Sequence, residues 1–146
     1  MQIKIKEVMV KKIIRNMLVY MMTSIYPIIV LAELPKIQLE NNIQIIAGGI
    51  GLDESIAIRK ESKNWPILFE FSKINGSKAE WISDVAIVIR DSKNKLIIAM
   101  NVEGPLILMK LAPGKYLLEA TFEGNKKIRL FEIADLKHKK ISIYWN

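Results

Sequence analysis

The stretch Tyr116-Leu-Leu-Glu-Ala-Thr-Phe122 alternates between two kinds of side chain. As an extended strand, it places Tyr116 and every second residue up to Phe122 on one face, and the polar Glu119 and Thr121 on the other. Because successive side chains of a strand point to opposite faces, this alternation is typical of a strand that buries one face. The set that begins at Tyr116 is therefore predicted to face a core.

Further short runs of the same kind surround this one. The seven predicted strands are Pro66–Lys73, Asp84–Arg90, Lys95–Val102, Leu106–Leu111, Lys115–Phe122, Lys127–Ile133 and Lys139–Trp145. The segments between them are rich in Gly, Pro, Asn and Asp, which tolerate positive φ or preset a turn. Seven short strands in about eighty residues are typical of an immunoglobulin-like sandwich. We expect an all-β, antiparallel sandwich over residues 65–146.

Residues 33–64 form the predicted lead to this domain. Its first half contains Asn41, Asn42 and the cluster Gly48-Gly49-Ile50-Gly51, which indicate an irregular or flexible stretch with a tight turn. The segment Asp53–Lys60 then has two acidic residues at its start and two basic residues at its end. This polarity favours a helix of two to three turns, because charges at both ends complement the helix dipole.

The first 32 residues have the layout of a signal peptide. Basic residues from Lys11 to Arg15 precede an uncharged apolar run that extends from Met17 to Ala32 and is followed by Glu33. The basic region stays in the cytoplasm, the apolar run enters the membrane, and the small residues at its end suit a signal peptidase. We therefore expect cleavage between Ala32 and Glu33, and a mature protein that is periplasmic or secreted.

Two alternatives to this segment's cleavage stay open. The apolar run could remain as an inner-membrane anchor, although at 16 residues it is short for a spanning helix, which needs about 20. It could also be a buried helix of the fold. Translation from Met9 instead of Met1 would give a signal of more typical length.

The net charge of +7 is concentrated at the start of the chain. Five of the 22 basic residues and one of the 15 acidic residues lie before Asn16, so the predicted domain carries only a small positive excess. No RNA-recognition motif, zinc-finger spacing or basic helix accompanies it, which argues against nucleic-acid binding. Cysteine is absent, which excludes disulfides, thiolate chemistry and a lipid attached to cysteine.

Three segments carry a resemblance to a known family: Ser83-Asp-Val-Ala-Ile-Val-Ile-Arg-Asp91, Leu111-Ala-Pro-Gly-Lys-Tyr116 and Ala120-Thr-Phe-Glu-Gly124. They resemble carboxypeptidase regulatory-like domains, which are transthyretin-like sandwiches. The chain is also similar to a group of exported proteobacterial proteins of unknown function in which a Gly-Gly-x-Gly lead precedes such a domain. The resemblance implies a non-catalytic domain that accompanies enzymes or surface proteins.

The most distinct element of this resemblance has a structural explanation. Pro113 and Gly114 are expected to make a turn, and Tyr116 begins the next strand with its ring inward. Its hydroxyl would then bond to backbone at the corner, as in a tyrosine corner.

Residues that could carry chemistry are isolated from one another. His138 is the only histidine and lies between two lysines in a polar turn, so a surface position is favoured over a catalytic triad or a zinc site. Asp53 and Glu54 are better explained as charges at a helix start than as a calcium site or an acid–base pair. The Gly48 cluster lacks the Lys-Ser/Thr of a phosphate loop. We therefore expect no catalytic residue, no metal and no cofactor, and a protein that is not an enzyme.

The three tryptophans are the remaining candidates for a binding site, because exposed aromatic residues stack on sugar rings and anchor protein partners. Trp145 alternates with Ile141 and Ile143 and is predicted to be in the core, and Trp65 is expected in the core or at its rim. Trp81 lies beside polar residues and is the best surface candidate. The leading hypothesis is an exported module that mediates protein–protein interaction in the cell envelope. The alternative is a glycan- or peptidoglycan-binding module that uses Trp81.

Overall fold

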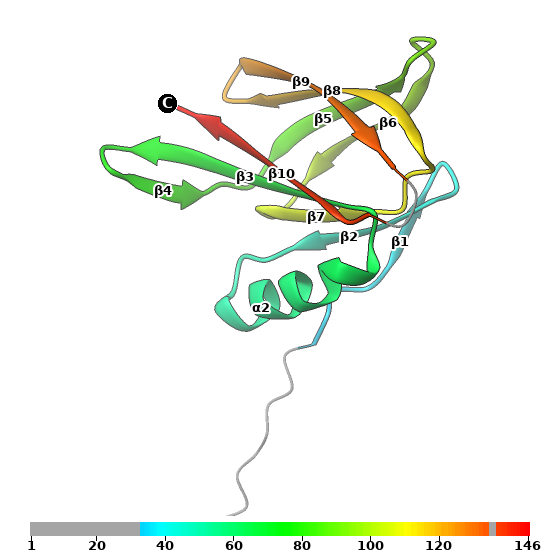
Figure 1. Ribbon diagram of the computed structural model, residues 1–146. Coiled ribbons are helices and arrows are strands. Elements are labelled where there is room, and N and C mark those ends of the chain that lie inside the picture. Colours follow the sequence, from blue (N-terminus) through cyan, green and yellow to red (C-terminus); the bar gives the residue numbers. More distant parts are fainter. Residues whose placement is uncertain (1–32, 135–136) are drawn as a thin grey trace, which may run out of the picture. The chain divides into compact units, whose positions relative to one another are not determined.

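The computed structural model of the protein describes residues 33–134 and 137–146, which form two β-sheets and one short α-helix (Figure 1). The predicted signal segment, with Ala32 of the predicted cleavage site, lies outside the described residues. Within these two ranges, no helix has the length and apolar character that crossing a membrane requires.

Sheet A has six strands. Five of them lie in the order β1-β2-β7-β3-β10, and the sixth, β4, pairs with the C-terminal end of β3. The strands are β1 (Gln38–Glu40), β2 (Ile43–Gly48), β3 (Ile67–Asn75), β4 (Lys78–Trp81), β7 (Leu106–Met109) and β10 (Lys139–Trp145). Neighbouring strands are antiparallel except β3 and β10, which run parallel.

Sheet B has four strands in the order β6-β5-β8-β9, all antiparallel to their neighbours. The strands are β5 (Val85–Asp91), β6 (Leu96–Val102), β8 (Gly114–Phe122) and β9 (Asn125–Ile133). A two-residue turn joins β8 to β9, and its residues Glu123 and Gly124 both have positive φ. Such turns match the twist of the strands they connect.

The main core lies between the two sheets and is built from alternate residues of their strands. On β5 the buried residues are Val85, Ile87 and Ile89. Aromatic rings join the layers: Phe131 of β9 meets Phe69 of β3 edge-on, with ring centroids 5.4 Å apart. Because the buried side chains between the sheets are apolar, hydrophobic burial is the main stabilising term.

A second, smaller core lies on the outer face of sheet A. The helix α2 (Leu52–Glu61) and the 3-10 turn η1 (Ser62–Asn64) follow β2, and α2 lies on the side of β2 and β7 that faces away from sheet B (Figure 1). This core consists of Ile46, Ile58, Trp65, Leu68, Leu106 and Leu108. The predicted helix is thus confirmed, with acidic residues in its first turn and basic residues in its last.

The predicted all-β fold of two sheets is confirmed, and each of the seven predicted strands is present within two residues of its expected bounds. Two details are wrong. The described residues form ten strands instead of seven, and the parallel pairing of β3 with β10 means that the sandwich is not purely antiparallel.

Two of the additional strands, β1 and β2, lie in the segment that was predicted to be irregular. In β2, Ile45 faces the main core and Ile46 faces the core under α2. A strand buried on both faces shows no alternation, so its pattern resembles neither a half-buried strand nor a loop. The third additional strand, β4, is short, its four residues are all exposed to solvent to some degree, and its pairing with β3 defines it.

The glycine cluster, predicted as a flexible hinge or a tight turn, is closely packed at Gly48 and Gly49 and open at Gly51. A Cβ atom added to Gly104, in the connection between β6 and β7, would lie 2.3 Å from the carbonyl oxygen of Gly48. The amide of Gly49 donates a hydrogen bond of 3.0 Å to a carboxylate oxygen of Glu54 in α2. Glycine is needed here because two backbone segments approach each other closely.

Candidate binding face

The outer face of sheet B has no described helix or strand packed on it, whereas α2 covers part of the outer face of sheet A. The strand register places Leu117 of β8 opposite Leu130 of β9, and Val88 of β5 beside Glu119. Leu130 is 82% exposed and Ile128 is 55% exposed. We call the outward side chains of Val88, Leu117, Ile128 and Leu130 the sheet B face.

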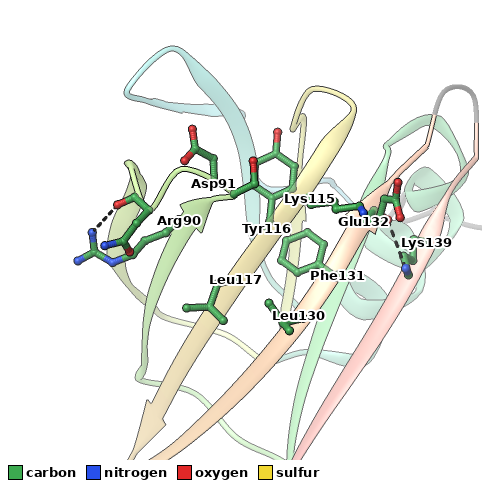
Figure 2. A pocket seen from close by; sticks show the side chains of 11 residues that line it. Arg90, Asp91, Lys115, Tyr116, Leu117, Leu130, Phe131, Glu132 and Lys139 are labelled. Atoms are coloured by element: carbon green, nitrogen blue, oxygen red, sulfur yellow. Dashed lines mark hydrogen bonds between the residues drawn. The ribbon is translucent and has the colours of Figure 1, made fainter.

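A hollow of about 580 Å³ adjoins the sheet B face where β5 ends, β8 begins and β9 ends (Figure 2). In Figure 2 the side chains of Leu117 and Leu130 lie side by side, with Arg90 on one side of them and Lys139 on the other. The hollow thus combines apolar side chains with cationic residues at its edges.

The polar groups around this hollow are mostly bonded within the protein. Arg90 donates through Nη1 to the carbonyl of Asn94 at 3.3 Å, and Lys139 donates through Nζ to the carbonyl of Glu132 at 3.2 Å. A carboxylate oxygen of Asp91 accepts two backbone amides of the β5–β6 turn, each at 2.9 Å. These hydrogen bonds fix the conformation of the edge of the hollow, and they give Asp91 a structural role in the β5–β6 turn.

Tyr116, expected to make a tyrosine corner, also lines the hollow. Its ring is buried and stacks on Phe131, and its hydroxyl donates a 2.8 Å hydrogen bond to the carbonyl of Ala112, just before Pro113. Burial, with a smaller contribution from the charge of Asp91, raises the pKa of Tyr116 above its ordinary value. The phenol therefore stays protonated and closes the turn that leads through Gly114 into β8.

Trp81, the predicted surface tryptophan, is 42% exposed at the end of β4. Its indole Nε1 donates a 3.1 Å hydrogen bond to Glu70, and the guanidinium of Arg59 from α2 lies 5.1 Å from the ring centroid. The hydrogen bond to Glu70 and the contact with Arg59 together fix the orientation of the indole. It borders a small hollow of about 140 Å³ that includes Gly49 and Pro105.

Glu70 is the centre of an ion cluster that the sequence analysis did not identify. It is buried on β3, and Arg59 of α2 and Lys140 of β10 both form ion pairs with it. Burial raises the pKa of Glu70, but the bond from Lys140 and the charges of Arg59 and Lys140 outweigh it, so the pKa lies below its ordinary value. One acidic residue inside the apolar run 67–71 was the only signal of this cluster in the sequence.

The other residues singled out by the sequence do not form a common site, although His138 contacts the backbone of Trp65. His138 is exposed, and its Nδ1 lies 2.9 Å from the carbonyl oxygen of Trp65. Trp65 is buried under α2, and Trp145 is buried in the main core, where its Nε1 donates to the carbonyl of Asn125 at 2.8 Å. Glu33 is exposed at the start of the described chain. Residues 33–134 and 137–146 contain no group of three His, Asp or Glu residues that could hold a metal ion.

Comparison of the chain with known protein families and with curated proteins gives no match.

Proposed function

We propose that this protein is a non-enzymatic, exported β-sandwich module that binds another protein of the cell envelope through the sheet B face. The observation that carries the proposal is the exposure of Leu130, which lies in the middle of a regular strand and is 82% exposed. Its opposite neighbour Leu117 and the nearby Ile128 extend the apolar surface across two strands.

The physical argument concerns the free energy of burying these side chains. Fully burying a leucine or isoleucine side chain contributes roughly 1.5–3 kcal/mol. Apolar side chains that gather on one face and are bordered by charged residues are typical of protein interaction sites. Arg90 and Lys139 supply such a border at the adjoining hollow. A partner that covers Leu130 and Ile128 therefore gains hydrophobic burial, and its polar groups can meet the charged rim.

The test is site-specific crosslinking in intact cells. A photoreactive amino acid replaces Leu130, and in a control chain it replaces Lys78, which is exposed on β4 of sheet A. We expect a discrete crosslinked species from position 130 that is absent from position 78 and that the added substitution Ile128→Ser weakens. If position 130 yields no species above the control, the sheet B face is not the binding site and the proposal is wrong.

The finer classification of the fold is part of this proposal. We propose that the sandwich is transthyretin-like, of the carboxypeptidase regulatory-like type, and is located in the periplasm or outside the cell. What supports this is the turn at Pro113 and Gly114, with the buried Tyr116 bonded back to Ala112. Domains of that type are non-catalytic, which agrees with the structural roles of Tyr116 and Glu70 given above.

A second candidate function is glycan or peptidoglycan binding through Trp81. The observation that favours it is a half-exposed indole, held by Glu70 and placed beside a small hollow. The cation of Arg59 already lies over the ring, which reduces the area left for a sugar. The crosslinking experiment separates the two functions, because binding through Trp81 leaves position 130 without a protein adduct.

A further inference from the structure

The outer edge of β9 is not paired with any described strand. β9 is nine residues long and pairs only with β8 among the described strands. Its neighbour β10 belongs to the other sheet and touches it through side chains near both ends: Trp145 donates to the carbonyl of Asn125, and Lys139 donates to the carbonyl of Glu132. Between these contacts the strand presents an unpaired backbone edge, to which a further strand can add.

The register shows which backbone groups lie on this edge. The β8–β9 hairpin closes with Phe122 opposite Asn125 across a two-residue turn. In an antiparallel ladder, hydrogen-bonded and non-hydrogen-bonded pairs alternate. Asn125 and the odd-numbered residues of β9 therefore bond to β8, and the amides and carbonyls of Ile128 and Leu130 point away from the sheet.

The two faces of β9 differ in chemistry along this free edge. On the outer face, Ile128 and Leu130 are exposed and belong to the sheet B face. On the inner face, Lys127 and Arg129 precede the buried Phe131, and Arg129 is exposed. In the described part of the chain neither cation has an ion-pair partner. An added strand would thus meet apolar side chains on one face and positive charge on the other.

The two cations on the inner face of β9 restrict which strands can pair with its free edge. Inward-pointing charges on an edge strand discourage indiscriminate pairing. A second copy of the chain, pairing through its own β9, would bring Lys127 and Arg129 close to the same two cations, and like charges directly opposite each other are destabilising. A segment with acidic side chains on that face would neutralise them instead.

We propose that the free edge of β9 binds an extended segment of a different protein as an added strand, with apolar side chains over Ile128 and Leu130 and acidic side chains beside Lys127 and Arg129. This inference rests on the proposed protein-binding function and specifies the chemistry of the partner. Backbone hydrogen bonds would supply part of the affinity and the alternating side chains the specificity, as in other cases of strand addition.

The test uses the full-length protein and three synthetic peptides. The first alternates valine and glutamate over eight residues, the second has lysine in place of glutamate, and the third is the first with its alternate backbone nitrogens methylated on one edge. We expect the glutamate peptide to bind at least about tenfold more tightly than the lysine peptide, because like charges across an interface are unfavourable. Hydrogen exchange should slow at the amides of Ile128 and Leu130, and the methylated peptide should lose binding.

Charge reversal supplies the matched variants. The double substitution Lys127→Glu with Arg129→Glu should invert the preference, so that the lysine peptide binds better. The control has the same change of charge, Lys93→Glu with Lys95→Glu, at two exposed lysines of the β5–β6 turn, and should keep the preference for glutamate. Far-ultraviolet circular dichroism verifies that both variants are folded.

Three results would overturn the inference. Equal binding of the methylated peptide would show that charge alone attracts it, and equal binding of the glutamate and lysine peptides would remove the predicted selectivity. If the amides of Ile128 and Leu130 are protected from hydrogen exchange without peptide and the protein has the mass of a dimer, a second copy of the chain covers the edge. If the peptide experiments fail while position 130 still crosslinks to a partner, strand addition is wrong and the protein-binding function stands.

Discussion

Glu70 illustrates how a single buried charge connects its own strand, β3, to three other elements. The carboxylate lies on β3 and is bonded by Arg59 from α2 and by Lys140 from β10, while Trp81 from β4 donates a further hydrogen bond. Removing a charge from water costs free energy unless its partners replace the lost hydration. Here these three groups do so, which is why the pKa of Glu70 falls despite its burial.

A pH dependence follows from the direction of this shift. The pKa of Glu70 is lower in the folded chain than in the unfolded one, so its contribution to stability is present above the unfolded pKa of about 4.3 and is lost as the pH falls through the folded pKa. Glu70→Gln should therefore lower the free energy of unfolding at pH 7, by about 1–3 kcal/mol. Denaturant titrations should show the difference from wild type shrinking toward pH 3.

The control for this prediction is Glu103→Gln, because Glu103 is exposed and forms no ion pair with the described residues. It should leave the free energy of unfolding within about 0.5 kcal/mol of wild type, as surface substitutions usually do. If the free energies of unfolding of wild type and Glu70→Gln differ by the same amount from pH 7 to pH 3, the stabilisation does not come from the ionised Glu70.

At the scale of elements, α2 is part of the fold and not an appendage that precedes it. Ile58 on the helix is fully buried and packs with Trp65 and with residues of three strands of sheet A. The segment 33–64 therefore supplies two strands of sheet A and the cover of its outer face. A domain boundary at residue 65 would cut through this second core.

Ile58→Ala tests the importance of this core. Truncating a buried isoleucine to alanine typically costs about 2–5 kcal/mol, because apolar contacts are lost and a cavity remains. The matched control is Ile56→Ala on the opposite side of the helix, where Ile56 is 54% exposed and should change stability by less than about 1 kcal/mol. Urea unfolding followed by tryptophan fluorescence measures both, and equal effects at the two positions would mean that α2 does not dock as described.

The strands also differ in how well the sequence pattern predicted their presence and their exposed face. Half-buried strands such as β5 and β8 were found because one face is apolar and turn residues bound them. β2 was missed because it is buried on both faces by two different cores. In β9, Ile128 and Leu130 point outward while Phe131 and Ile133 point inward, so both faces carry apolar residues and the sequence pattern does not identify the exposed one.

At the scale of the whole molecule, the two sheets are covered unequally. Sheet A has a core on each face, whereas the described residues leave the outer face of sheet B and the edge of β9 to solvent. Both proposed contacts meet on β9, because Ile128 and Leu130 belong to the sheet B face and also border the free edge. One strand could thus supply side chains and backbone to the same partner.

The compartment of the protein is a prediction at this scale. We expect the intact mass of the protein recovered from the periplasm or the medium to correspond to residues 33–146, because the predicted cleavage lies between Ala32 and Glu33. Mass spectrometry of fractionated cells measures this. The full-length mass in the membrane fraction would indicate a retained anchor, and the same mass in the cytosol would contradict export.

The sequence by itself determined the features that arise locally. These are the signal-like pattern of residues 1–32, the helix near Asp53–Lys60 and the positions of seven strands, because side-chain period and turn residues act over a few neighbouring positions. Only the tertiary structure decided which strands meet. The burial of β2, the parallel pairing of β3 with β10, the ion cluster at Glu70 and the exposure of Leu130 all depend on contacts between residues far apart in the chain, and the pattern of a single segment does not specify its distant partner.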